Sequence, residues 1–156
     1  MLFFYRSNTK MKKKIAVCFV VFIRNETTFN IAIDTLCSLK EHKTTHDIDT
    51  FMWEVECKPE YRAYLKQFAK RYTIGNKNIL ARNWNRSIKF AFQNNYDYCM
   101  IPNMDIILER DMINNLVNFA ENNQDALVYS PYAINHTYGK PNSTYLVKPE
   151  GHIDYD

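Results

Sequence analysis

The segment YDYCMIPNMDIIL, residues 96–108, contains two side chains that could bind a metal ion through oxygen, Asn103 and Asp105. Both come after the apolar run, and Asp105 lies between apolar neighbours. Asn103 precedes this aspartate by two residues, and residues i and i+2 of an extended segment project to the same side. Such oxygens suit Mg²⁺ or Mn²⁺, with water and substrate phosphates completing the coordination. The pair is therefore a candidate metal site. The alternative is that Asp105 only caps a turn.

A candidate phosphate site lies in NKNILARNWNRS, residues 76–87. Asn76, Asn78 and backbone amides precede a predicted helix, whose positive dipole end attracts anions. Arg82, one turn into that helix, offers a fork of N–H donors to the same anion. The alternative is an ordinary solvent-facing polar stripe. Neither GxxxxGK[ST] nor GxGxxG occurs, which excludes a Walker loop and a dinucleotide fingerprint.

Other chemistries find little support in the sequence. The four histidines and four cysteines have no zinc-ligand spacing, and HExxH is absent. Ser87 and Ser130 lack the context of a nucleophile elbow. The cysteines form no CxxC pair, so we expect four free thiols in a reducing, intracellular compartment.

Strands alternate with helices along the chain. We expect strands near residues 14–23, 50–56, 72–74, 96–102 and 126–131. Thr27 or Thr28 is expected to cap the first helix, and Pro59 to open the second. This alternation predicts a three-layer, Rossmann-like α/β domain with a mostly parallel central sheet.

The apolar run after Lys12–Lys14 is long enough for a signal peptide but reads better as a buried strand, because no cleavage site follows it. It is also too short to span a bilayer, so no transmembrane segment is expected. We therefore divide the chain into an N-terminal extension, residues 1–13, and one domain, residues 14–156, with Met11 an alternative start.

Parallel sheets bind ligands outside the carboxyl ends of their strands. The polar residues expected there are Arg24 and Asn25 after the first strand, Glu56 after the second, Asn76 and Asn78 after the third, and Asn103 to Asp105 after the fourth. With 156 residues, 46% of them hydrophobic, and a net charge of +3, the chain is an ordinary single domain whose charge is too mild to indicate nucleic acid.

The order of these features resembles the nucleotide-sugar-binding part of a family 2 glycosyltransferase of the GT-A fold. The similar segments are IAVCFVVFIRNETTFNIAIDTLCSL, NKNILARNWNRSIKFAF and YDYCMIPNMDIIL, within residues 14–132. The resemblance implies transfer of a sugar from a nucleotide-sugar donor to an acceptor hydroxyl. The acceptor, whether glycan, lipid or protein, is not indicated.

The resemblance also implies roles for individual positions. Arg24, Asn25 and Glu56 correspond to residues that hold the nucleotide base. Asp105 corresponds to an aspartate of the family's DxD motif, which binds Mn²⁺ or Mg²⁺ on the diphosphate. Asn103 replaces the first aspartate and brings no charge, which predicts weaker metal binding or none.

The catalytic base of such an enzyme is not identified in this sequence. Family members usually continue for on the order of a hundred further residues that carry an acidic base, so the resemblance implies a domain shortened at its carboxyl end. Asp154 and Asp156 have suitable chemistry but are not assigned. The alternatives to a glycosyltransferase are a non-catalytic nucleotide-binding or interaction module and, less favoured, a nucleotidyltransferase. The expected location is the cytoplasm, with a membrane-peripheral site or a virus-infected cell as further settings.

Overall fold

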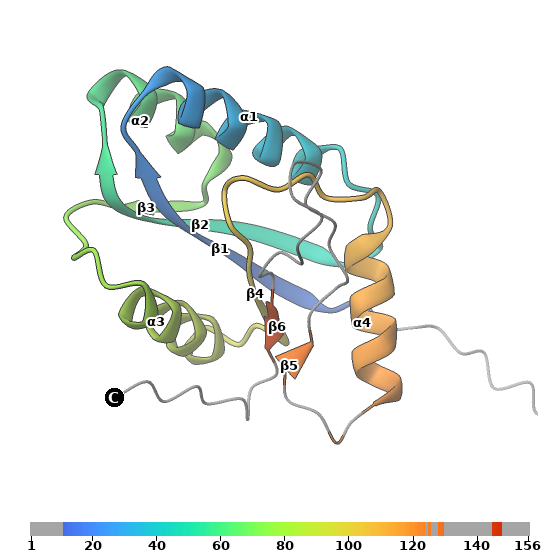
Figure 1. Ribbon diagram of the computed structural model, residues 1–156. Coiled ribbons are helices and arrows are strands. Elements are labelled where there is room, and N and C mark those ends of the chain that lie inside the picture. Colours follow the sequence, from blue (N-terminus) through green and yellow to red (C-terminus); the bar gives the residue numbers. More distant parts are fainter. Residues whose placement is uncertain (1–10, 124, 126–127, 130–144, 148–156) are drawn as a thin grey trace, which may run out of the picture.

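The computed structural model describes residues 11–123, 125, 128–129 and 145–147. A six-stranded sheet in the order β3-β2-β1-β4-β6-β5 forms its centre (Figure 1). The four strands β3 (Arg71–Thr73), β2 (Asp47–Cys57), β1 (Lys14–Ile23) and β4 (Tyr98–Ile101) are mutually parallel. The predicted α/β class with a mostly parallel sheet is confirmed.

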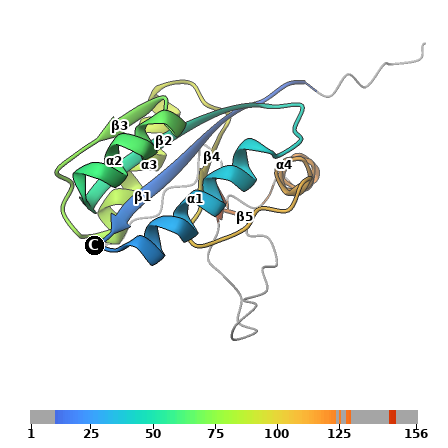
Figure 2. The same cartoon turned by 90° about the horizontal axis from the view of Figure 1, so that it is seen from above.

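Strand β1 is buried on both faces, which explains its unbroken apolar sequence. Alternate residues such as Val17 and Phe19 join one core with α1, α2 and α4, whereas Ala16 and Cys18 join a second core under α3. Figures 1 and 2 show α1 and α2 on one side of the sheet and α3 on the other. The predicted three layers are therefore present.

The helices are α1 (Glu26–Lys40), α2 (Pro59–Leu65), which continues into a 3₁₀ turn at Lys66–Phe68, α3 (Leu80–Gln93) and α4 (Met112–Asn122). Pro59 opens α2 as expected. The prediction of a threonine cap for α1 is wrong: Asn25 is the cap, and its Oδ1 accepts the Thr28 N–H at 2.9 Å. Thr28 completes a capping box, because its Oγ1 accepts the Asn25 N–H in return.

The last part of the sheet differs from the sequence prediction. Of the strand expected at residues 126–131, the structure describes β5 at Val128–Tyr129, and positions 126–127 and 130–131 lie outside the described residues. Strand β6 (Tyr145–Val147) was not predicted, and it runs antiparallel to both β4 and β5. Three residues are too few to show a period in sequence.

The strand order reverses at β1. The chain builds β2 and β3 on one side of β1 and then returns to place β4 on the other side. Such a switch point opens a crevice at the carboxyl ends of the two central strands, and ligands of open α/β sheets bind there. The loop after β1 and the loop after β4 are therefore the segments to search.

Strands β1 and β2 extend well beyond β4. The last register pair between β1 and β4 is Val17 with Met100, so β1 continues for six more residues, roughly 20 Å of strand. Near the tip the register between β1 and β2 shifts, so that Val21 pairs with Glu54 but Phe22 pairs with Glu56. The bulge leaves Val55 without a partner and sets the direction of the Glu56 side chain.

All four cysteines are free thiols. Cys18 and Cys99 lie on neighbouring strands, and contact with Cys18, together with burial, raises the pKa of the Cys99 thiol. Because Cys99 is in register with Ala16, its Cα lies about 8 Å from that of Cys18 in ideal strand geometry. A disulfide needs a shorter Cα separation, so this pair suits packing of reduced thiols.

Candidate nucleotide-sugar site

Arg24 and Glu56 meet at the projecting tip of β1 and β2. The Arg24 Nε donates to the Glu56 carboxylate at 3.0 Å, and both side chains are more than half exposed. The Arg24 guanidinium also lies 4.4 Å from the centre of the Phe22 ring. A planar polar ring such as a nucleobase would find donors, an acceptor and an aromatic face here. The structure thus brings two predicted residues together and adds Phe22, whose place in an apolar strand gave no signal.

Asn25 occupies the same tip but is engaged in the capping box of α1. Its Oδ1 accepts from the Thr28 N–H and the Thr28 hydroxyl. The residue therefore fixes where the first loop ends and the helix begins. Any contact of Asn25 with a ligand has to coexist with this capping role.

Asp105 lies in a turn after β4, and its residue is exposed. The expected extended conformation from Asn103 to Asp105 is not found, since Met104 and Asp105 form the turn. The following backbone is tied to α1, because Ile106 N–H donates to Thr35 Oγ1 at 3.2 Å and Leu108 N–H donates to Ser38 Oγ at 3.1 Å. These bonds hold the Asp105 turn against the middle of α1.

The hydrogen bonds from the Asp105 turn to α1 also show how far this turn lies from the start of the helix. Thr35 stands nine residues into α1, roughly 13 Å along the helix from Glu26. The Arg24–Glu56 pair thus lies near the start of α1, and the Asp105 turn lies beside its middle. The hydrogen bonds and ion pairs described for residues 11–123 link Arg24 to Glu56, and link neither of them to Asp105 or Arg82.

The chemistry of the donor set decides whether a metal fits at Asp105. Among the described residues, no three His, Cys, Asp or Glu side chains gather to hold an ion. One carboxylate and one amide suit a hard cation that takes its other ligands from water and a diphosphate. The extended geometry that was expected to face Asn103 and Asp105 the same way is absent, because Met104 and Asp105 form a turn. The Asp105 carboxylate alone would fit a metal ion only if a bound diphosphate and water supplied the other ligands.

The loop between β3 and α3 uses its asparagines internally. Asn76 donates through Nδ2 to the backbone oxygens of Glu54 and Thr73, both at 3.0 Å, and its Oδ1 accepts from Arg86. Asn78 and Arg82 are exposed, and α3 begins without a side-chain cap. Asn78 and Arg82 are thus open to an anion, whereas Asn76 shapes the loop.

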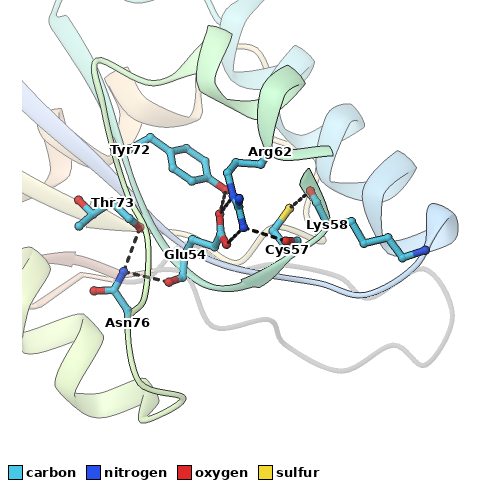
Figure 3. Close-up of polar contacts among 7 residues, drawn as sticks. All are labelled: Glu54, Cys57, Lys58, Arg62, Tyr72, Thr73 and Asn76. Carbon is cyan, nitrogen blue, oxygen red and sulfur yellow. Dashed lines mark hydrogen bonds and ion pairs between the residues drawn. The ribbon is translucent and has the colours of Figure 1, made fainter. Parts of the chain in front are cut away.

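A buried glutamate two residues before Glu56 was missed in the sequence. Glu54 is 3% exposed, accepts two hydrogen bonds of 2.7 Å from Arg62, and accepts one of 2.8 Å from the Tyr72 hydroxyl (Figure 3). Burial and the bond to Glu54 raise the pKa of Tyr72. Burial also raises the pKa of the nearby Cys57 thiol. The signal in the sequence was a charged residue between Trp53 and Val55, inside the apolar run TFMWEVEC.

This cluster secures the second helix to the sheet. Arg62 belongs to α2, Glu54 to β2 and Tyr72 to β3, so the hydrogen bonds join three elements. Arg62 also donates to the Cys57 backbone oxygen at 3.1 Å, next to the tip that carries Glu56. The Glu54 cluster thus supports the candidate site without being exposed to a ligand.

A cavity of about 550 Å³ lies elsewhere. It is bordered by the carboxyl-terminal half of α1, the end of α2 and the amino-terminal half of β2. None of the predicted site residues lines it. Its position at the opposite ends of the strands separates it from the switch point.

Solved structures share this fold. A protein described as a nucleotide-diphospho-sugar transferase from Desulfovibrio desulfuricans superposes with a TM-score of 0.59 at 11% identity, over 90% of this chain and 65% of its own. TarS from S. aureus gives 0.61 at 9% identity, over 87% and 47%. A cytidylyltransferase from Leptospira borgpetersenii gives 0.60 at 14% identity, over 89% and 61%.

These likenesses define the class of fold, which is that of nucleotide-diphospho-sugar transferases and cytidylyltransferases. This chain spans about half to two thirds of the length of these three structures. No family model and no curated protein matches the sequence. Within the described residues, no helix has the length and apolar character needed to cross a bilayer.

Proposed function

We propose that this protein binds a nucleotide sugar at the carboxyl edge of its sheet and acts as a glycosyltransferase of the family 2 type. The observation that supports this most is the exposed Arg24–Glu56 pair, held over Phe22 at the tips of β1 and β2. It stands beside the strand-order switch, in a fold shared with nucleotide-diphospho-sugar transferases. Asp105 follows β4 on the other side of that switch.

Each residue has a role in this proposal. Glu56 accepts from, and Arg24 donates to, the polar edge of the base, while Phe22 supports its face. Asp105 and Asn103 would hold a divalent ion carried by the diphosphate, and the ion supplies positive charge opposite the departing phosphate. Arg82 and Asn78, at the uncapped start of α3, would bind phosphate oxygens.

The reaction proposed is displacement at the anomeric carbon of the sugar by a hydroxyl of the acceptor. A nucleoside diphosphate leaves, and its growing negative charge is stabilised by Arg82 and by the helix dipole at the start of α3. The base that removes the hydroxyl proton is not assigned, because Asp154 and Asp156 lie outside the described residues.

A nucleotidyltransferase is the second candidate, since cytidylyltransferases share the fold. The loop after β1, Arg24 and Asn25, contains no glycine and runs directly into the capped helix. Such a loop leaves less room for a triphosphate than a glycine-rich loop would. A non-catalytic nucleotide-binding module would keep the Arg24–Glu56 pair and lack transfer activity.

Calorimetric titration tests the binding part of this proposal. UDP, CDP and GDP would each be titrated into the protein with Mn²⁺ and with EDTA, and then into Asp105→Ala and Asp105→Asn. Loss of the charged ligand should weaken metal-dependent binding by about 2 kcal/mol, roughly 30-fold. Equal affinity in a folded Asp105→Ala protein would contradict the role of Asp105.

A second assay separates the enzyme classes. Release of nucleoside diphosphate from a panel of nucleotide sugars, with and without candidate acceptors, reports glycosyl transfer. Release of pyrophosphate from nucleoside triphosphates in the presence of sugar phosphates reports nucleotidyl transfer. Binding without either product would leave the non-catalytic module as the function.

A further inference from the structure

Basic residues are concentrated in one part of the chain. Residues 58–96 hold nine of the twenty Lys and Arg residues but only one of the seventeen Asp and Glu residues. This segment forms α2, β3 and α3. Both views show these three elements together at one end of the molecule (Figures 1 and 2). The fold therefore gathers a positive charge that the net charge of the chain conceals.

Contacts across β3 bring these charges onto one edge. Lys66, after α2, reaches the ring of Tyr72 on β3 at 5.9 Å, and Arg71 on β3 lies 5.4 Å from the ring of Phe90 on α3. Arg86 of α3 lies 4.7 Å from the ring of Trp53 on β2. Aromatic rings hold these cations without neutralising them.

Few of these charges are paired. In the part of the chain that the structure describes, Arg62 and Lys70 form the ion pairs of this segment, with Glu54 and Asp49. The exposed residues outside these pairs are Lys58, Lys66, Arg71, Lys77, Arg82, Arg86 and Lys89. Strand β3 pairs with β2 and is at the opposite end of the sheet from β5 and β6. Lys58 lies over Tyr61, whose ring stacks on Phe29 of α1, and points away from β3 (Figure 3). We name the surface that the other six residues form the basic edge.

The loop from β3 to α3 adds exposed apolar side chains to the basic edge. Ile74, Ile79 and Leu80 are 51%, 44% and 51% exposed. Their backbone is nevertheless fixed, because Asn76 N–H donates to the Glu54 oxygen at 2.9 Å and the buried Asn83 side chain donates to the Lys77 oxygen at 3.0 Å. The loop thus presents apolar groups outward from a rigid support, with Lys77 between them.

We propose that the basic edge docks on an anionic lipid membrane, with Ile74, Ile79 and Leu80 entering the interface. Lysine and arginine next to a negatively charged leaflet attract it, and nearby apolar groups gain by leaving water. A nucleic acid or an acidic polysaccharide would bind the charges, but it has no apolar interior in which the three apolar side chains could be buried. Arg82 belongs both to the basic edge and to the proposed phosphate site at the start of α3, so the variants that test membrane docking leave Arg82 unchanged.

Vesicle flotation tests the proposal with matched variants. The wild-type protein should float with phosphatidylcholine–phosphatidylglycerol vesicles, remain behind with phosphatidylcholine alone, and lose binding as salt rises. Lys66→Glu/Lys89→Glu should weaken binding to the anionic vesicles at least about tenfold, because each basic residue near the membrane surface increases the affinity several-fold. Lys40→Glu/Lys43→Glu makes the same change in charge away from the basic edge and should have a much smaller effect.

The apolar contribution is tested separately by Ile74→Ser/Ile79→Ser. This variant should lose vesicle binding but keep its retention on immobilised heparin, which has charge without an apolar interior. Thermal unfolding like that of wild type shows that each variant is folded. The proposal is overturned if wild type does not bind anionic vesicles, if both charge variants weaken binding equally, or if the serine variant binds vesicles as wild type does.

Discussion

At the scale of single residues, two glutamates on β2 have opposite roles although only Val55 separates them. Glu54 is buried and bonded to Arg62 and Tyr72, whereas Glu56 is about half exposed and paired with Arg24. The register shift between β1 and β2 lies between these two positions. In the sequence both glutamates are charges at the end of an apolar run, and nothing in the spacing separates a buried one from an exposed one.

This contrast predicts a dissociation between stability and binding. Glu54→Gln should lower the urea midpoint of unfolding several times more than Glu56→Gln does, because it weakens a buried charged hydrogen-bond group. Glu56→Gln should instead weaken nucleoside diphosphate binding while leaving stability nearly unchanged. Urea unfolding and calorimetry on both variants measure the two effects. Similar profiles for the two variants would contradict the assignment.

For the other candidate residues, the sequence predicted an edge of the sheet but not the contacts that each side chain makes. Arg24 and Asp105 follow β1 and β4 as expected, because parallel strands direct their loops to one edge. Glu56 was expected after the second strand but is the second-last residue of β2. The cap was assigned to a threonine, whereas Asn25 has that role, since both residue types cap helices well. The internal bonds of Asn76 depend on a tertiary contact with Glu54, which no local pattern contains.

At the scale of elements, the end of α1 is joined to the start of α4 through a histidine. His42 Nε2 accepts the Ile113 N–H at 3.2 Å, so the proton of the neutral ring is on Nδ1. Burial lowers the pKa of His42 from 6.5, and the opposing effects of Asp111 and the Glu109 backbone do not cancel it. Protonation would therefore break a contact between two helices.

The sign of the resulting pH dependence follows from linkage. A histidine with a lowered folded-state pKa takes up protons more readily when the protein unfolds, so stability is full above pH 6.5 and falls as the pH drops below it. His42→Gln keeps a hydrogen-bond acceptor and removes the titration. Unfolding midpoints measured on both sides of pH 6.5 should show a smaller decline on acidification in His42→Gln. If stability falls equally in wild type and His42→Gln on acidification, other titrating groups cause the loss.

The elements were predicted best where their patterns are long. Strand β1 was placed at its observed bounds, because ten mostly apolar residues between charged flanks leave little choice. The short strands β3 and β4 were placed within one or two residues. The pairing of β6 with β4 joins residues more than forty positions apart, and two short strands give no local signal of such a partner.

At the scale of the whole molecule, the strand order decides where a ligand can bind. The reversal at β1 places the loops after β1 and β4 at the same edge of the sheet, and the two long strands carry Arg24 and Glu56 beyond the end of β4. The basic edge lies along β3 and faces away from β5 and β6. Neither arrangement follows from composition, because a net charge of +3 averages over a basic edge and an acidic remainder.

The central claim is that the carboxyl edge binds a nucleoside diphosphate with its metal near Asp105. Nuclear magnetic resonance of ¹⁵N-labelled protein tests this directly, since paramagnetic Mn²⁺ broadens nearby amide signals and Mg²⁺ does not. With UDP, CDP or GDP and Mn²⁺, we expect broadening centred on residues 103–106. With Mg²⁺, we expect shifts without broadening at Phe22, Arg24 and Glu56. Perturbation confined to the cavity beside Leu39 and Phe68, or none with any of these nucleotides, would contradict the claim.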